Sequence, residues 1–446
     1  MSEIDEITKI QIVSENEELV GSEEDTHSSD HFIDTISDEE KKELVDTIHE
    51  LLEEYVKKEI MTISNPDYHN YMLEEVTAII FASLCEGSIC SKNDYEGILE
   101  FVESTVTDWY DQNPNYPLRQ QSHFDNESYI HMFGLSPEFV TRMIGGKLEK
   151  LQMENALLPE QRTPEWYLTR HNMITASNLY KIFGSEAVQN QLIFEKCKPL
   201  LETSSSESTF VNTESSTHWG VKYEPLSQLF YESLTKVTPE SFGCIPHPRY
   251  PFIGASPDGI VTDSSSVFYG RMLEIKNIVN RKIDGIPSEA YWVQMQIQME
   301  VCDLDVCDFL ETRFKEYEEV EFYEDSINEK GVILYFVKRE YGSNSPYYVY
   351  MPLDHKKDSP EDVNEWIEQQ KSENPDYILF KTIYWYLDEY SLITVRRNDE
   401  WFSSVLPQIA DFWELIQKER VSGYEHRAPK KRSGSFVEVV KLDVSM

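Results

Sequence analysis

The sequence predicts a mixed α/β protein with a helical extension before its α/β part. Short β-strand patterns bounded by turn residues alternate with helical patterns in the second half of the chain, whereas apolar residues before residue 112 recur mainly at helical spacing. The 446 residues, 40% of them hydrophobic and 12% aromatic, are sufficient to bury a sizeable core. A wholly disordered chain is therefore excluded.

The first 40 residues differ in composition from the rest. They contain 14 acidic residues and one lysine, so this segment carries too much charge and too little apolar surface to fold alone. We expect an acidic disordered tail at 1–40. A helical N-terminal region that ends in a linker is expected at 41–134. Its first helix is indicated by the helical spacing of Leu44, Ile48 and Leu52.

A larger domain is expected over 135–420, followed by a C-terminal tail at 421–446. Its start is marked by Ser136-Pro137-Glu138, which combines an N-cap serine, a first-turn proline and an acid that suits a helix N-terminus. Strand candidates follow at 331–339, 346–353 and 390–397, and a closing helix is expected near 404–419.

The formal net charge of −41 argues against a general electrostatic attraction to nucleic acid, because phosphate binding usually needs clustered Lys and Arg. The acidity is uneven, however. Residues 161–312 contain 19 acids and 12 bases, a net charge of −7. A local path for a nucleic acid therefore stays possible in this part of the chain.

Other composition features exclude several protein classes. No apolar stretch approaches the ~20 residues that cross a bilayer, and the acidic N-terminus lacks an apolar signal region. We therefore expect a soluble intracellular protein without a membrane partner. The six cysteines have no zinc-like spacing, so reduced thiols are expected.

The segment YPFIGASPDGIV (250–261) holds one carboxylate in a restricted setting. A β-strand pattern breaks at Gly254, and Asp258 then stands between a proline and a glycine. Turn chemistry at such residues fixes the backbone. A fixed backbone at Asp258 suggests that the direction of its side chain matters for function.

The segment RMLEIKN (271–277) presents an acid and an amine together. Because side chains alternate across a strand, Glu274 and Lys276 share one face while the residues beside them face the core. If 262–270 is the loop of a hairpin, Glu274 can converge with Asp258.

Two carboxylates with a backbone carbonyl between them form the all-oxygen site that Mg²⁺ prefers and that Mn²⁺ can also occupy. Such an ion holds the negative charge that develops during phosphodiester hydrolysis and lowers the pKa of a bound water. Lys276 would orient that water or help to deprotonate it. Taken alone, the pattern also fits a surface salt bridge.

Two helix candidates add polar residues to the pattern. The segment HWGVKYEPLSQLFYE (218–232) contains Glu224, and YWVQMQIQMEV (291–301) places Gln294 and Gln298 on one helical face. Glutamines on an otherwise apolar helix are unusual, because a buried amide needs hydrogen-bond partners.

In this order, the motifs resemble the lambda exonuclease/YqaJ-type viral recombinase nucleases of the PD-(D/E)XK superfamily. The blocks are EWYLTRHNMITAS (165–177), WGVKYE (219–224), GASPDGIV (254–261), LEIK (273–276) and YWVQMQ (291–296). The resemblance implies that the domain at 135–420 is a nuclease domain of restriction-endonuclease-like α/β fold. Its central mixed sheet would have helices on both faces and the two site acids on neighbouring strands.

The resemblance also implies roles for the residues of the strand pair. Asp258 and Glu274 would be metal ligands, with the backbone carbonyl of Ile275 as the third, and Lys276 would serve the nucleophilic water. The cofactor would be Mg²⁺, with Mn²⁺ as a substitute.

Further roles are implied outside the strand pair. Glu224 would be a supporting acid, and Gln294 would orient the site, whereas Gln296 points elsewhere on the helix. Arg170 and Ser177 match positions that contact the 5′-terminal phosphate of DNA in this family. A partly buried structural arginine and a helix N-cap are the alternatives for these two residues.

The function implied by the resemblance is Mg²⁺-dependent hydrolysis of DNA, from the ends of linear double-stranded DNA in the 5′-to-3′ direction, in recombination or repair. A single-strand annealing protein and further copies of the chain are additional expected partners. Members of this family are commonly encoded by viruses with large DNA genomes. We therefore expect a virus-encoded protein that acts inside the host cell.

Two alternatives stay open. One is an endonuclease, or a nuclease of repair or RNA turnover, that keeps the metal site without the end-binding pocket. The other is a catalytically weak scaffold that binds partner proteins. Intact Asp258, Glu274 and Lys276 argue against the scaffold, and dependence on a 5′-phosphate separates the exonuclease from the first alternative.

Overall fold

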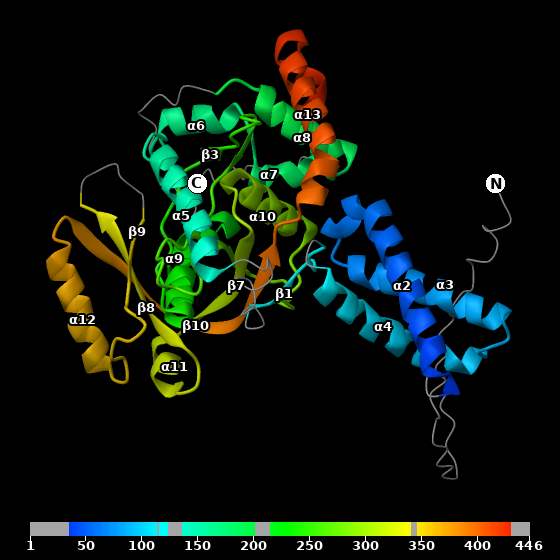
Figure 1. Ribbon diagram of the computed structural model, residues 1–446. Coiled ribbons are helices and arrows are strands. Elements are labelled where there is room, and N and C mark those ends of the chain that lie inside the picture. Colours follow the sequence, from blue (N-terminus) through cyan, green and yellow to red (C-terminus); the bar gives the residue numbers. More distant parts are fainter. Residues whose placement is uncertain (1–34, 114–115, 124–135, 201–214, 340–345, 430–446) are drawn as a thin grey trace, which may run out of the picture.

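The computed structural model describes residues 35–113, 116–123, 136–200, 215–339 and 346–429. Within these ranges a central sheet carries helices on both faces, and a helical unit lies on one side of it (Figure 1). On the opposite side, β8 (Lys330–Lys338), β9 (Tyr347–Tyr350) and α12 (Pro360–Glu373) form an arm that continues the sheet. The predicted α/β fold with a helical N-terminal extension is confirmed. Most of the predicted acidic tail, the end of the predicted C-terminal tail and much of the predicted linker lie outside the described residues.

The central sheet is mixed. Its strand order is β5-β6-β7-β10-β8-β9, and β1 pairs with β10. The strands are β1 (Gln121–Ser122), β5 (Gly259–Ile260), β6 (Met272–Asn277), β7 (Val306–Tyr317), β8 (Lys330–Lys338), β9 (Tyr347–Tyr350) and β10 (Tyr377–Arg396). Only β6 and β7 are parallel in the part of the sheet that the structure describes. A parallel pair needs a crossover, which α10 (Glu289–Cys302) provides.

The strand before Asp258 does not pair with the strand of Glu274. β4 (Ile253–Ala255) belongs to a separate small sheet with β2 (Ile174–Thr175) and β3 (Ile245–Pro246). The predicted hairpin is present, but its first strand is the short β5, which begins directly after Asp258. Proline cannot donate to a strand ladder, so Pro257 separates β4 from β5.

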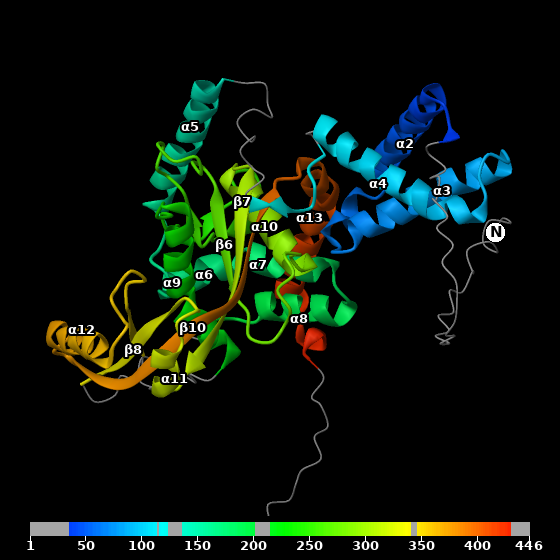
Figure 2. The ribbon, with the colours of Figure 1, turned by 90° about the horizontal axis from the view of Figure 1, so that it is seen from below.

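Helices cover both faces of the sheet (Figure 2). On one face Phe230 and Tyr231, from α9 (Ser216–Thr235), pack against Leu273 and Ile275 of β6. On the other face, α10 is enclosed by the sheet, η2 (Ile60–Ser64), α7 (Ala176–Leu179) and α13 (Asp399–Ser422), and its residues 292–302 are all buried. The polar side chains of α10 therefore need internal partners. No helix in the described ranges has the length and apolar character to cross a bilayer.

β10 is much longer than the predicted strand at 390–397. Its first part pairs with β8 and its second part with β7, with irregularities near Lys381 and between Leu387 and Glu389. The sequence analysis missed the first half of this strand, although the aromatic and β-branched residues of 377–387 are typical of a strand.

The other predicted elements of this region are close to their expected places. Ser136 caps α5 (Pro137–Asn155), since its hydroxyl accepts a hydrogen bond from the Phe139 N–H. The remaining helices of the core and arm are α6 (Pro164–His171), α8 (Glu186–Cys197), α11 (Glu319–Glu324) and α12 (Pro360–Glu373). The predicted closing helix is α13.

The helical unit consists of α2 (Asp38–Lys58), α3 (Tyr68–Glu86) and α4 (Tyr95–Gln112). α2 starts with a capping box, in which the Ser37 hydroxyl accepts from the Glu40 N–H and the Glu40 carboxylate accepts from the Ser37 N–H. Ile48 and Leu52 are fully buried, as their helical spacing predicts.

The segment 116–123, expected to belong to a linker, is partly buried, with Pro117, Arg119 and His123 inside the protein. Arg119 is fully buried, and its guanidinium donates to the carbonyl oxygens of Ser64 (2.9 Å) and Pro287 (2.6 Å). The Trp292 indole N–H, on α10, donates to the Arg119 carbonyl (2.9 Å). These bonds join the helical unit to the beginning of α10.

Asp308 is a fully buried carboxylate of β7 with four side-chain partners. It contacts Arg271 (3.1 Å), His123 (3.2 Å), Thr394 (3.1 Å) and Tyr231 (2.8 Å). Burial alone would raise the pKa of Asp308, but the hydrogen bond from His123 and the charge of Arg271 outweigh it and lower that pKa. Asp308 thus stabilises the fold as an anion.

We expect Asp308→Asn to lower the free energy of unfolding by about 3–5 kcal/mol, because Arg271 would lose its buried counter-ion. Since the pKa of Asp308 is lowered in the folded state, its contribution is present above the unfolded pKa of about 3.9 and is lost as pH falls through the folded pKa. Urea unfolding of the unchanged protein and of Asp308→Asn at several pH values measures this contribution. Glu368→Gln, at an exposed pair on α12, should change little.

Candidate active site

Asp258 is fixed at the edge of β6 by backbone contacts. Its N–H donates to the Leu273 carbonyl (3.1 Å), and its Oδ2 accepts from the Ile275 N–H (2.6 Å). Only glycine fits directly after it, because a Cβ on Gly259 would lie 2.5 Å from the Cβ of Pro239. The structure therefore brings Asp258 to the strand of Glu274, as the sequence analysis expected.

Glu274 and Lys276 project from the same face of β6, toward α10. The Glu274 side chain is 1% exposed and that of Lys276 is 22% exposed. The Lys276 ammonium forms an ion pair with Glu274 Oε1 and lies 5.0 Å from the ring centre of Tyr291. The sequence analysis placed only the residues beside Glu274 and Lys276 against the core. In the structure both faces of β6 are covered, so Glu274 and Lys276 are also largely enclosed.

Two glutamines of α10 hold the Glu274 carboxylate. Gln294 Nε2 donates to Oε1 (2.7 Å), and Gln298 Nε2 donates to Oε2 (2.6 Å). Gln296 points elsewhere, as expected, and donates to the Arg396 carbonyl (2.8 Å). Gln294 and Gln298, one helical turn apart, therefore each donate to one oxygen of the same carboxylate.

The sequence analysis assigned a site role to Gln294 and missed Gln298. The signal was available, because the two residues are four apart and share a helical face. Gln298 also donates to the Ser256 carbonyl (3.3 Å), two residues before Asp258. It therefore connects Glu274 of β6 to the loop that carries Asp258.

Glu224, on α9, is a solvent-exposed residue at the rim of the same site, where the charges of Glu274 and Lys276 act on its carboxyl. Nearby protein atoms displace part of the water around the carboxyls of Glu224 and Asp258. This loss of solvation and the charge of Glu274 raise the pKa of both carboxyls. Burial disfavours the charged form of Lys276, but Glu274 and Asp258 outweigh it and raise the pKa of that ammonium. The site thus concentrates negative charge around one cation.

The donor set fits a hard divalent cation such as Mg²⁺. A residue in a strand directs its N–H and C=O to the same side, so the Ile275 carbonyl shares the edge where its N–H meets Asp258. In the described part of the chain, no three His, Cys, Asp or Glu side chains are arranged to hold a metal ion. Mg²⁺ does not require three, since it often binds through one or two carboxylates with water and substrate phosphates.

The two residues expected to bind a 5′-phosphate have different surroundings. The Arg170 guanidinium stacks on Trp166 (4.6 Å to the ring centre) and lies 3.5 Å from the hydroxyl of Ser256, two residues before Asp258 in the chain. Ser177 is exposed and contacts Thr175 (3.4 Å). Thr175, not Ser177, occupies the N-cap position of α7, so the N-cap alternative for Ser177 is wrong.

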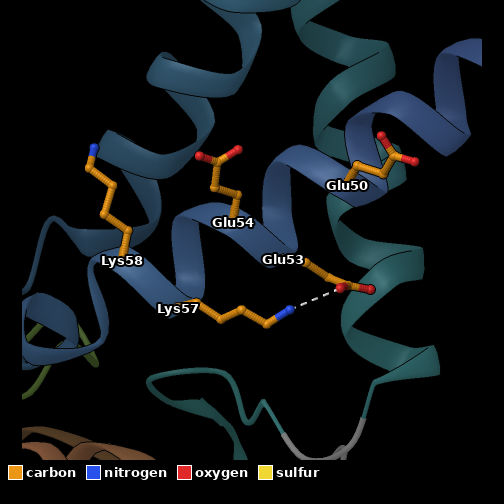
Figure 3. A pocket seen from close by; sticks show the side chains of 5 residues that line it. All are labelled: Glu50, Glu53, Glu54, Lys57 and Lys58. Carbon is orange, nitrogen blue, oxygen red and sulfur yellow. Dashed lines mark hydrogen bonds and ion pairs between the residues drawn. The ribbon is translucent and has the colours of Figure 1, made fainter.

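A surface hollow lies on α2, in the helical unit, and none of the site residues described above lines it. Its lining consists of Glu50, Glu53, Glu54, Lys57 and Lys58 (Figure 3). The Lys57–Glu53 pair (3.1 Å) has side chains that are 60% and 53% exposed, as expected for a solvated helix surface. We assign no site to this hollow.

Comparison with known proteins identifies the segment that carries the site. Residues 165–305 match the family model of the YqaJ-like viral recombinase domain. The resemblance to the YqaJ-type nucleases is confirmed. All of the site residues described above lie in this segment, whereas the helical unit and the arm that contains β8, β9 and α12 lie outside it.

Several individual proteins are similar to this chain. An uncharacterized protein of Acanthamoeba polyphaga mimivirus is 29% identical over 328 residues, which cover 64% of this chain and 57% of that protein. Among solved structures, an alkaline exonuclease from Laribacter hongkongensis is 17% identical, with 58% of this chain and 94% of that chain covered and a TM-score of 0.34. A phage-related exonuclease from Haemophilus somnus 129PT is 13% identical, with 55% and 96% covered and a TM-score of 0.30. The assignment of the domain rests on the family match and not on these overall similarities.

We expect Gln298→Leu to weaken binding of Mn²⁺ about tenfold, because Glu274 Oε2 would lose the donor that orients it. Gln296→Leu, on the same helix, is the matched control and should leave the affinity for Mn²⁺ unchanged. Both changes should lower the free energy of unfolding by about 1–3 kcal/mol, since each leaves a buried group without a partner. Calorimetric titration and urea unfolding test this, and equal Mn²⁺ affinities for the two variants would contradict it.

Proposed function

We propose that this protein is a metal-dependent nuclease that hydrolyses phosphodiester bonds of DNA. The observation that carries the proposal is the convergence of Asp258, Glu274 and Lys276 at one edge of β6. A surface salt bridge would not explain a buried acid that also receives hydrogen bonds from Gln294 and Gln298. The match of 165–305 to the viral recombinase domain supports the same function.

Asp258, Glu274 and the Ile275 carbonyl would hold Mg²⁺, or Mn²⁺ in its place. When bound, the ion would stabilise charge on phosphate oxygens and lower the pKa of a water. The chain itself provides orientation, because Gln294 and Gln298 leave the Glu274 carboxylate little freedom to rotate. Lys276 would orient the nucleophilic water and offset the negative charge that develops on the phosphate.

The proposed substrate is the end of linear double-stranded DNA, degraded in the 5′-to-3′ direction. Arg170 lies beside Ser256, two residues before Asp258, and would bind a terminal phosphate while the bond next to it is cleaved. Ser177 is exposed and would add a hydroxyl donor. Glu224, at the rim, would be a supporting acid that is neutralised in part by the bound cation.

A role in viral recombination or repair follows from the same resemblance. The similarity to a mimivirus protein and to the viral recombinase domain supports an origin in a large DNA virus. A strand-annealing partner and assembly with further copies of the chain are part of this proposal and are open to pull-down and light-scattering measurements.

We expect digestion of a linear, end-labelled duplex to require Mg²⁺ and to stop with EDTA. Lys276→Ala should lower the rate at least 10²–10³-fold, because charge stabilisation at the reacting phosphate is lost. Lys315→Ala, at an exposed lysine of β7, is the control and should retain the rate of the unchanged protein. Cutting of the duplex at internal positions would favour an endonuclease, and absence of cutting with either metal would favour a scaffold.

Arg170→Ala should abolish the preference for an end that carries a 5′-phosphate over one with a 5′-hydroxyl, because the guanidinium near Ser256 would be missing. The rate on the two ends, measured with separate substrates, gives this preference directly. Retention of a strong preference by Arg170→Ala would show that another group binds the terminal phosphate.

A further inference from the structure

Glu311 is a buried carboxylate that the proposed function leaves unexplained. It lies on β7 directly opposite Lys276 of β6, and its side chain is 0% exposed. Partner residues of neighbouring strands project from the same face, so Glu311 points to the side of Glu274 and Lys276. The Glu311 carboxylate therefore lies beside the site, on the face of the sheet from which Lys276 projects.

Among the described residues, only one oxygen of the Glu311 carboxylate has a hydrogen-bond or ion-pair partner. Oε1 forms an ion pair with the Arg281 guanidinium, whereas Oε2 is buried without any hydrogen-bond partner among the described residues. Buried polar atoms without partners are rare in folded proteins, and a charged oxygen is the least favourable case. Oε2 therefore lacks a donor that another state of the molecule is expected to supply.

Lys276 is placed to be that donor. Neighbouring strands are roughly 4.8 Å apart, so a lysine side chain can reach the carboxylate of its cross-strand partner. The Tyr291 ring also brings the groups together, because the Lys276 ammonium lies 5.0 Å and the Arg281 guanidinium 5.4 Å from its centre. Arg281 in turn contacts Glu311.

A cation at the proposed metal site would displace the Lys276 ammonium from Glu274. Glu274 already accepts hydrogen bonds from Gln294, Gln298 and Lys276, and its two oxygens offer about four acceptor positions. A divalent cation on Glu274 would lie next to the Lys276 ammonium, and the two positive charges would repel each other. The ammonium then needs another anion within reach.

We propose that Glu311 is a positioning residue, whose free oxygen receives the Lys276 ammonium when a divalent cation occupies Glu274. The inference rests on the proposed function, since it requires a metal at that carboxylate. Glu311 would keep the ammonium at the site in the loaded state, while Arg281 holds the carboxylate in place through its other oxygen.

A double-mutant cycle on the full chain tests this with Mn²⁺ alone, measured by calorimetric titration. Glu311→Gln keeps the size of the side chain but removes the charge, so it should weaken Mn²⁺ binding at least tenfold. In a Lys276→Met background no ammonium has to move, and the same change should alter the affinity no more than twofold. Equal effects in the two backgrounds would overturn the proposal.

Glu316→Gln is the control, because Glu316 is another acid of β7 that pairs with a lysine, Lys222, away from Glu274. It should leave the Mn²⁺ affinity unchanged. A crystal structure with Mn²⁺ gives a second measurement, in which Lys276 Nζ should lie within hydrogen-bond distance of Glu311 Oε2. Lys276 still paired with Glu274 beside the bound ion would also overturn the proposal.

The outcomes separate this inference from the proposed function. If the unchanged protein binds no Mn²⁺, or if Asp258→Asn leaves binding unaffected, the proposed metal site fails and the role of Glu311 fails with it. If Mn²⁺ binding depends on Asp258 but Glu311→Gln has no effect on it, only the role of Glu311 is wrong.

Discussion

Compensation of the buried Glu274 charge is the constraint on which the rest of the site depends. A carboxylate that is 1% exposed is tolerated only with hydrogen bonds and a counter-ion. Lys276 supplies the charge, and two amides of α10 supply the bonds. The parallel β6–β7 pair is part of the same solution, because its crossover is the helix that carries these amides.

The surroundings of α10 follow from this requirement. A helix that donates hydrogen bonds to a buried acid must be held in one position along its axis. Residues 292–302 of α10 are all buried, so neighbouring elements hold the helix in this way. Arg119 adds a fixed point at its beginning, since the guanidinium binds the Pro287 carbonyl and the Trp292 indole binds the Arg119 carbonyl. The segment 116–123, which lies outside the viral recombinase match, thus helps to hold the helix that carries the two glutamines.

The sequence predicted most of the site because its chemistry is local. Turn residues around Asp258 and strand alternation at Glu274 and Lys276 are visible in short segments, and the structure places these groups together. The same reasoning missed contacts between distant segments. The hydrogen bond from Arg119 to the Pro287 carbonyl, 168 residues away, leaves no periodic signal in the sequence. The assigned roles of Arg170 and Ser177 stay predictions, because phosphate contacts depend on a bound DNA.

The buried segment around Arg119 has a consequence for the choice of fragments in the laboratory. A recombinant protein trimmed to the family match, or one that begins at residue 135, would lack Arg119, His123 and the β1 edge strand. Such a truncation would leave Asp308 without one of its partners and would expose apolar surface on α10. The shortest stably folded fragment is therefore expected to begin before residue 116, although the recognisable domain begins at residue 165.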